Sequence, residues 1–199
     1  MTTIRLSAFS DEAADGIDGQ IAALKRNGIA YTELRSVDGK NVSEFTDEET
    51  AAYARKLHDA GIRVWAVGSP LGKTDISADF SEYENKVRRV CKTANILSTD
   101  KVRIFSFFNA YGERQKVIER LRRMTEIGNE YGITMCHENE KEIYGDTAEH
   151  ILDLMDHVPD LRLVYDPANF LQVGELPEDT LPLLSRCEYV HIKDARISG

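Results

Sequence analysis

The sequence predicts an α/β fold in which strand–helix units repeat around a parallel sheet. One pattern occurs three times: a helix-like stretch, then Gly, then Ile, then a short apolar run. It is found in "RNGIAYTELR" (26–35), "DAGIRVWAVG" (59–68) and "EYGITMCHE" (130–138). Gly after a helix adopts the left-handed conformation that ends it. An apolar run directly after that Gly predicts a strand buried on both faces, as in a parallel sheet.

Seven strands and six helices are expected to alternate along the chain. The strands are predicted near 4–9, 30–35, 62–68, 101–106, 133–138, 161–165 and 188–193. The helices are predicted near 13–27, 47–60, 81–97, 112–131, 147–157 and 178–186. No Pro-, Gly- or Ser-rich linker separates these units. We therefore expect a single domain over residues 1–199.

Two of the helix starts carry a capping signature. Thr46 with Glu49, and Ser81 with Glu84, each match a capping box, in which the side chains at the first and fourth positions bond each other's backbone N–H. Two further segments place apolar residues on one helical face, at positions 17, 21 and 24 and at positions 117, 121 and 124. Both observations support the expected alternation.

Composition and charge exclude several classes of protein. The formal net charge of the 199 residues is −9, which disfavours binding to nucleic acid. The basic stretches "RQKVIERLRR" (114–123) and "KVRR" (86–89) fall on predicted helices and are interpreted as solvated faces. The three scattered cysteines form no CxxC motif and predict free thiols. No stretch has the length of a membrane span and no secretory signal is evident, so a cytoplasmic protein without a membrane partner is expected.

Polar and ionisable residues gather where the predicted strands end. In a βα array this edge of the sheet carries function. The residues concerned are Glu33, Arg35, Asn109, Glu138, Glu140, Asp166, Asn169, His191, Lys193 and Asp194. The predicted strand starts are apolar except for four basic positions, Arg5, Arg63, Arg103 and Arg162.

Three of these strand-end residues form a candidate metal site. If the sheet closes towards a barrel, Glu138, Asp166 and His191 converge at one rim. Two carboxylates and one imidazole suit Mn²⁺, Mg²⁺, Co²⁺ or Zn²⁺. Taken singly, each has another interpretation: His191 as a core histidine, Asp166–Pro167 as a turn, and Glu138 as an ion-pair partner of Lys141 or Arg35.

The motifs "CHENEKEIYGD", "LVYDPANFLQVG" and "YVHIKDA" resemble the sugar phosphate isomerase/epimerase family. That family belongs to the xylose isomerase-like (β/α)₈ TIM barrels, with keto-sugar 3-epimerases, inosose dehydratases and endonuclease IV-type proteins. The resemblance implies a bound divalent ion, commonly Mn²⁺, with Glu138, Asp166 and His191 as its first three ligands. It also implies a substrate-contacting role for Asn169, and Lys193 belongs to the HxKD form of the last motif.

The chain is shorter than such a barrel, which usually takes about 250 residues. The last helix, the eighth strand and the fourth ligand, a Glu on that strand, are expected to be missing from these 199 residues. An incomplete barrel would leave open strand edges, which favour pairing with another chain. A homodimer is therefore one expectation. Impaired activity of this short form is another.

The resemblance implies proton transfer at a carbon next to a carbonyl, through an enediolate, in a sugar or sugar derivative. Glu138 is the expected catalytic base, and Asn169, Lys193, Glu33, Arg35 and Asn109 are the expected substrate-binding residues. A dehydratase of keto-inositol type is an alternative, because the same enolate can expel a hydroxyl group. A non-catalytic sugar-binding or scaffold barrel is a third interpretation. The identity of the sugar stays open.

Overall fold

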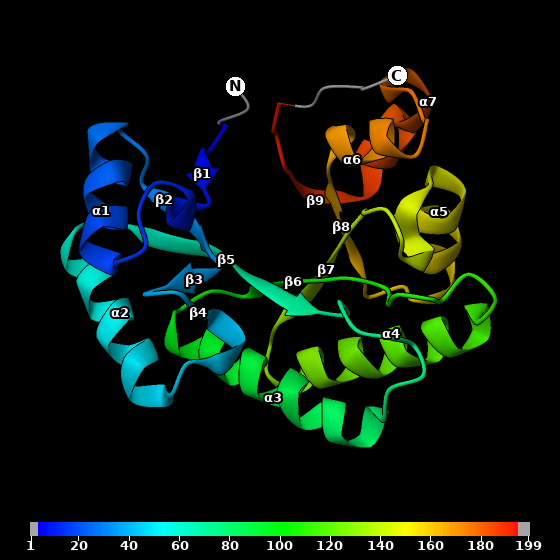
Figure 1. Ribbon diagram of the computed structural model, residues 1–199, viewed down its shortest axis with the longest axis horizontal. Helices are drawn as coiled ribbons and strands as arrows, with labels where there is room; N and C mark the ends of the chain where they lie inside the picture. The colour runs from blue at the N-terminus through cyan, green and yellow to red at the C-terminus, as the bar shows by residue number, and fades with distance from the viewer. Residues whose placement is uncertain (1–3, 195–199) are drawn as a thin grey trace.

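The computed structural model describes residues 4–194, which form a parallel sheet of seven strands covered by helices on its outer side (Figure 1). The strand order is β1-β2-β5-β6-β7-β8-β9, and every neighbouring pair is parallel. The strands span Ser7–Ala8, Tyr31–Leu34, Arg63–Leu71, Lys101–Ile104, Thr134–Glu138, Arg162–Tyr165 and Cys187–Val190. The predicted fold class and the seven predicted strands are confirmed.

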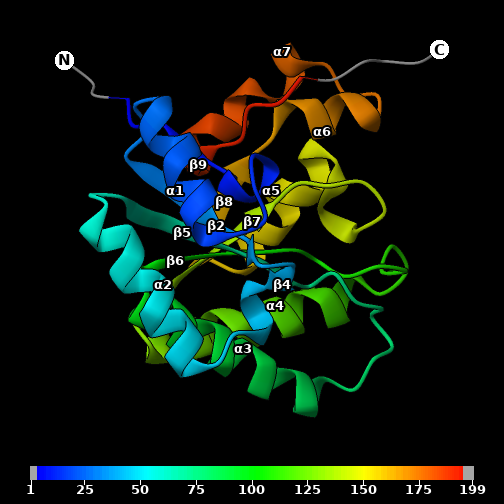
Figure 2. The ribbon, with the colours of Figure 1, turned by 60° about the vertical axis from the view of Figure 1, so that its left-hand side comes forward.

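The sheet curls into part of a barrel (Figure 2). Strand β1 pairs only with β2, and β9 pairs only with β8, so these two strands are the edges of the sheet within residues 4–194. The α-helices α1 to α7 span Ile17–Arg26, Asp47–Asp59, Phe80–Ile96, Arg114–Glu130, Ala148–His157, Pro167–Gln172 and Pro177–Thr180. In both ribbon views the long helices lie on the convex side, which leaves the concave side for the site.

The main core lies between the convex face of the sheet and the helices. In the β6–β7 pair, Val102 lies opposite Met135 and Ile104 opposite His137. All four side chains are buried. Arg103 and Cys136, opposite each other one position along, point to the concave side, because strand residues alternate between faces. This alternation decides which residues reach the site.

The helix starts test the two predicted capping boxes. Thr46 and Glu49 form one at the start of α2, with both side chain–backbone bonds present, as predicted. The box predicted at Ser81 and Glu84 is wrong. Helix α3 begins one residue earlier, and Asp79 is its N-cap and accepts from the Ser81 backbone N–H. Glu84 is therefore free to accept two bonds from Arg123 of α4.

The short helix α6 is not among the six predicted helices. Asp166–Pro167 resembles a turn in sequence, but Asp166 is an N-cap and Pro167 occupies the first helical turn, where its missing N–H costs nothing. The segment predicted as a helix over 178–186 divides into α7 and the 3₁₀ helix η4 (Leu181–Arg186).

Two differences concern the first third of the chain. The 3₁₀ helix η1 (Ser10–Glu12) precedes α1, so that helix begins at Ile17 instead of near residue 13. A small antiparallel pair, β3 (Ser36–Val37) with β4 (Lys40–Asn41), follows β2 and was not predicted. The second residue of its tight turn, Gly39, has φ of 72°, a conformation open to glycine. The 3₁₀ helices η2 (Val42–Glu44) and η3 (Tyr144–Asp146) complete the elements.

Across residues 4–194, the helices are all too short or too polar to cross a lipid bilayer.

Candidate active site

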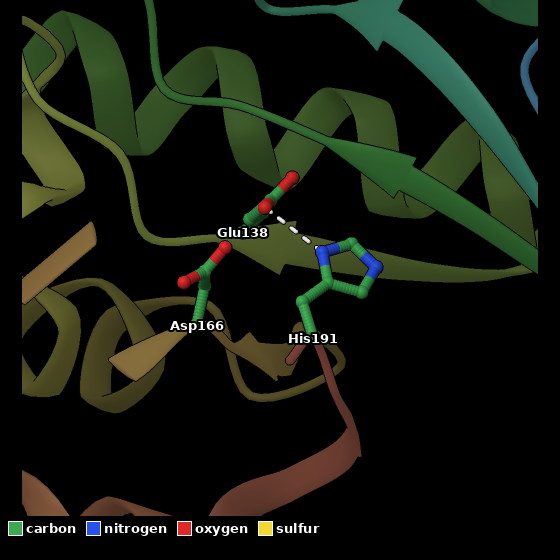
Figure 3. Close-up of side chains that lie close together, drawn as sticks. All are labelled: Glu138, Asp166 and His191. Carbon is green, nitrogen blue, oxygen red and sulfur yellow. Dashed lines mark hydrogen bonds and ion pairs between the residues drawn. The ribbon is translucent and has the colours of Figure 1, made fainter. Parts of the chain in front are cut away.

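Glu138, Asp166 and His191 meet at the carboxyl edge of the sheet (Figure 3). Glu138 is the last residue of β7, Asp166 directly follows β8 and His191 directly follows β9. One ligand atom from each lies within 4.8 Å of the other two. These three neighbouring strands therefore bring together the three residues expected to bind a metal ion.

Asp166 is held by the start of helix α6. Its Oδ1 accepts a hydrogen bond of 3.0 Å from the backbone N–H of Asn169. Its Oδ2 is buried and accepts no well-directed hydrogen bond, although Lys193 Nζ lies 2.9 Å away. The side chain is only 1% exposed. One carboxylate oxygen of Asp166 is thus fixed by the helix, and the other faces the ammonium group of Lys193.

Asn139 fixes the end of β7 to the end of β8. Its side chain donates a hydrogen bond of 2.9 Å to the Asp166 carbonyl and accepts one of 2.8 Å from the Asp166 N–H. The backbone carbonyl of Asn139 accepts a hydrogen bond of 2.8 Å from the Asn169 side chain. These three buried bonds hold Asp166 and Asn169 in place relative to Glu138.

His191 lies between two carboxylates. Its Nδ1 is 2.9 Å from Glu138 Oε1 and its Nε2 is 2.9 Å from Glu33 Oε2. Burial alone would lower the pKa of His191, but the hydrogen bonds to Glu138 and Glu33 raise the pKa to about 9. In the metal-free chain at neutral pH, His191 is therefore an imidazolium that bridges the two acids.

Glu138 is charged at any ordinary pH. Burial alone would raise its pKa, but the hydrogen bond from His191 and the charge of Arg103 lower the pKa to about 2. Arg103 NH1 lies 3.1 Å from Glu138 Oε2. Both oxygens of this carboxylate thus face a cation. These positive charges offset the repulsion between the carboxylates gathered at this edge of the sheet.

Arg103 is the main residue of the site that sequence reasoning missed. Its position appeared to be the start of a strand, but its side chain is buried on the concave face, with Nε 3.6 Å from Glu33 Oε1. Its guanidinium also lies over the rings of Phe9, at 5.2 Å, and Phe105, at 5.1 Å. The alternation of residues 101, 103 and 105 carried the signal for this orientation.

The predicted substrate-binding residues fall into two groups. Asn169, Lys193, Glu33 and Arg35 line one cavity of about 900 Å³ with the three candidate ligands. Lys193 Nζ donates 2.6 Å to Asn169 Oδ1, beside Asp166. Asn109 does not line this cavity. Its side chain donates a hydrogen bond of 2.5 Å to Asp75 in an exposed loop.

The charged residues around the cavity form ion pairs that differ from those between sequence neighbours. Arg35 binds Asp11, at 2.8 Å, and not its neighbour Glu33. Lys73, in the loop after β5, binds Glu140 at 2.6 Å. Glu138 binds Arg103 and His191, where the alternative partners had been Lys141 or Arg35.

The donor atoms of the cluster fit a divalent cation. They are two carboxylate oxygens and one imidazole nitrogen, a mixed set that suits Mn²⁺, Co²⁺ or Zn²⁺, and Mg²⁺ less well because it prefers oxygen ligands. Asp166 contributes one carboxylate oxygen to the cluster, and its buried Oδ2 has no directed hydrogen bond. Three protein ligands would leave coordination positions open for substrate oxygens.

A half-barrel of parallel strands with a carboxylate–imidazole cluster at its carboxyl edge defines an α/β barrel protein with a candidate metal site. The model of the Xylose isomerase-like TIM barrel family matches residues 21–198, and the chain belongs to that family. The resemblance inferred from the three sequence motifs is confirmed at this level.

One curated relative is a 3-dehydroshikimate dehydratase of Bacillus anthracis, 24% identical over 176 residues. The match covers 84% of this chain and 62% of the relative, so the chain spans less than two thirds of that protein's length.

Solved structures of low sequence identity share the fold. The probable 3-DHS dehydratase involved in petrobactin synthesis from Bacillus anthracis superimposes with a TM-score of 0.79 and 22% identity, over 96% of this chain and 73% of that one. D-psicose 3-epimerase from Clostridium cellulolyticum H10 gives 0.73 and 14%, over 93% and 72%. The 3-keto-D-glucoside 4-epimerase of E. coli gives 0.73 and 13%, over 94% and 78%.

Proposed function

We propose that this chain carries the metal site of an isomerase or epimerase that transfers a proton at a carbon next to a carbonyl in a sugar or sugar derivative. The observation that supports this most directly is the meeting of Glu138, Asp166 and His191 within 4.8 Å at the carboxyl edge of the sheet. Membership of the xylose isomerase-like family agrees with it.

Glu138, Asp166 and His191 would hold the divalent cation, for which Mn²⁺ is the first candidate, with Zn²⁺, Co²⁺ and Mg²⁺ as alternatives. A bound cation of this kind supplies Lewis acidity, which stabilises negative charge on the oxygens beside the carbon that loses its proton.

The protein's own residues supply the other parts of the reaction. Glu138 is ionised and faces the cavity edge, so its carboxylate is the candidate base for the proton. Lys193 and Asn169 lie side by side, next to Asp166, and can bind the hydroxyl or carbonyl oxygens of a substrate in donor and acceptor roles. Arg103 and Glu33 lie behind Glu138 and His191 and hold them.

A second carboxylate is needed on the opposite face for inversion at carbon. Within residues 4–194, the acids of the cavity beyond the cluster include Glu140, bound to Lys73, and Glu33, bound to His191. Both are engaged by cations. Glu138 is paired with cations in the same way, so these ion pairs do not decide the second group, and we propose for it the Glu that the family resemblance places on an eighth strand.

Proton transfer can be tested separately from complete turnover. The chain, loaded with Mn²⁺ in D₂O, would be incubated with a panel of ketoses, their phosphates and cyclic hydroxyketones, and mass spectrometry would detect deuterium bound to carbon. We expect incorporation that Glu138→Gln reduces by about 10²-fold or more, the usual scale of general-base catalysis. Equal exchange in wild type and Glu138→Gln would contradict the assignment of the base.

Dehydration of a cyclic hydroxyketone is a second candidate, favoured by the similarity to the 3-dehydroshikimate dehydratase of Bacillus anthracis. The first proton transfer is the same, but the electrons then expel a hydroxide from the next carbon, and the substrate loses one water. The same incubation separates the two reactions, since a product lighter by one water indicates dehydration and an isomer of unchanged mass indicates epimerisation. Thermal stabilisation by a sugar without exchange or turnover would favour the non-catalytic binding interpretation.

A further inference from the structure

We infer that Glu33 is a positioning residue for His191: it binds the Nε2 side of the ring so that Nδ1 faces Glu138 and Asp166. This inference rests on the proposed metal site and gives Glu33 a role other than the substrate contact expected from sequence. It assigns to strand β2, on the far side of the cavity from β8, a part in building that site.

The geometry of the ring separates Glu33 from the candidate ligands. His191 Nδ1 lies 2.9 Å from Glu138 Oε1, within the cluster that also contains Asp166. Nε2 lies 2.9 Å from Glu33 Oε2. The two nitrogens point to different sides of one imidazole, so an ion at Nδ1 has Glu33 behind the ring. Glu33 does not belong to the group of ligand atoms within 4.8 Å of one another.

Glu33 is buried and lies near a second cation besides His191. The side chain is 4% exposed, and Arg103 extends from Glu33 to Glu138, with Nε 3.6 Å from Glu33 Oε1 and NH1 3.1 Å from Glu138 Oε2. One guanidinium thus forms ion pairs with both carboxylates that flank His191.

Two further contacts restrict the ring and its partner. Phe9 packs edge-on against His191, with ring centroids 5.0 Å apart. At Gly68 of β5, a Cβ atom would lie 3.3 Å from Glu33 Oε1 and 3.3 Å from Phe9 Cε1, so a residue without a side chain lets both groups approach the strand. The ring of His191 is therefore in contact with Glu33 of β2 and with Phe9, the residue after β1.

Such a partner has a defined chemical effect. When Nε2–H donates to a carboxylate, the tautomer is set, the Nδ1 lone pair is free for a cation, and that nitrogen becomes more basic. Loss of a partner of this kind typically weakens metal binding by roughly 10–100-fold.

The experiment measures Mn²⁺ affinity of the full chain by electron paramagnetic resonance of the free ion. Glu33→Ala removes the acceptor, Glu33→Gln keeps an acceptor oxygen of the same shape, and Glu140→Gln removes one negative charge from another wall of the same cavity. We expect Glu33→Ala to weaken Mn²⁺ binding by roughly 10–100-fold, Glu33→Gln to restore part of this loss, and Glu140→Gln to have a clearly smaller effect. Circular dichroism of each variant verifies its fold.

A second readout follows the ring itself. In long-range ¹H–¹⁵N spectra of the Zn²⁺-loaded chain, wild type should show a slowly exchanging, low-field Nε2–H signal of His191. This signal should persist in Glu33→Gln and disappear in Glu33→Ala. The His191→Gln variant assigns it among the five histidines.

The outcomes separate this inference from the proposed function. If wild type binds Mn²⁺ and Glu33→Ala binds it equally well, with the Nε2–H signal unchanged, Glu33 does not position His191 although the metal site stands. Equal losses in Glu33→Ala and Glu140→Gln, with no recovery in Glu33→Gln, would reduce the role of Glu33 to its charge and overturn the inference. If wild type binds neither Mn²⁺ nor Zn²⁺, the proposed metal site itself fails, and the inference fails with it.

Discussion

Two histidines on the two faces of the same sheet, His137 fully buried and His191 partly buried, have opposite properties. His137 of β7 points into the layer between sheet and helices, and both of its ring nitrogens lack a hydrogen-bond partner. His191 faces the concave cavity, and both of its nitrogens contact carboxylates. Burial lowers the pKa of His137 to about 4, whereas the two acids raise the pKa of His191 to about 9 in spite of burial.

The comparison shows that the face of a strand, more than depth of burial, decides what an ionisable side chain does here. His137 and Glu138 are adjacent in sequence, yet alternation sends the first to the apolar layer and the second to the cavity. On the convex face an imidazole is a neutral space-filling group. On the concave face the same ring is a cation among acids, and a candidate ligand.

The largest expected difference between the two faces is in metal content. His191→Ala removes a candidate ligand, so elemental analysis after purification without chelator should show the Mn, Co or Zn content falling sharply. His137→Leu should keep the wild-type content, because its ring touches no candidate ligand atom. A loss of metal in His137→Leu with its fold intact, or full retention in His191→Ala, would break the comparison.

The next largest effect is expected on stability, when the buried cation of the concave face is removed. Arg103→Met leaves Glu33 and Glu138 buried with less compensation, and breaking such a pair typically costs about 3–5 kcal/mol. Urea unfolding of the metal-free chain measures this cost, and added Mn²⁺ should recover part of it by binding only the folded state.

Arg88→Met is the matched control for this variant, because Arg88 pairs with Glu130 on the solvent side of α3. An exposed pair of that kind contributes about 0–1 kcal/mol. Equal costs for the two substitutions would mean that the buried pair is worth no more than a surface one.

Sequence alone was sufficient for the fold class and for the meeting of Glu138, Asp166 and His191 at one edge of the sheet, whereas their binding of a metal ion stays a prediction. Gly after a helix, apolar runs and strand alternation place Glu138, Asp166 and His191 at one edge. Arg103 was missed because it was grouped with the basic residues at strand starts, although β6 begins at Lys101 as predicted and alternation along 101, 103 and 105 puts Arg103 on the concave face.

The contact of Glu33 with His191 could not be predicted from local pattern. It joins residues 158 positions apart, and it exists only because the sheet curls so that β2 faces β9 across the cavity. The wrong prediction of the N-cap of α3 has a simpler cause. Asp79 and Ser81 are both favourable N-cap residues, and the helix uses Asp79, two residues earlier in the chain. The substrate, the metal and a cytoplasmic location remain predictions.

The two histidines should also give the metal-free chain opposite pH dependences. His191 has a folded pKa of about 9 against an ordinary value of 6.5, so its stabilisation is complete below pH 6.5 and is lost as pH rises through 9. His137 has a folded pKa of about 4, so between pH 6.5 and 4 the unfolded chain takes up a proton that the folded chain refuses, and stability falls with falling pH.

Urea unfolding between pH 4 and 10 tests this assignment. His191→Gln should flatten the alkaline limb of the profile and His137→Leu the acid limb, each by a few kcal/mol at most. If His137→Leu altered the alkaline limb instead, the assignment of the two limbs would be wrong.

The smallest expected effect is that of His137→Leu at pH 7. The ring is neutral there, its nitrogens make no hydrogen bond, and Leu is apolar and of similar bulk, so the lost packing and the relieved burial of polar atoms act in opposite directions. We expect the free energy of unfolding to change by less than about 1.5 kcal/mol. His191→Leu in the metal-free chain should cost more, because it leaves Glu33 and Glu138 facing each other with Arg103 as their shared cation. A larger cost for His137→Leu than for His191→Leu would mean that the convex-face ring does more than fill space. The close approach of Gly145, where a Cβ would lie 2.3 Å from His137 Cε1, identifies the place to look for that extra role.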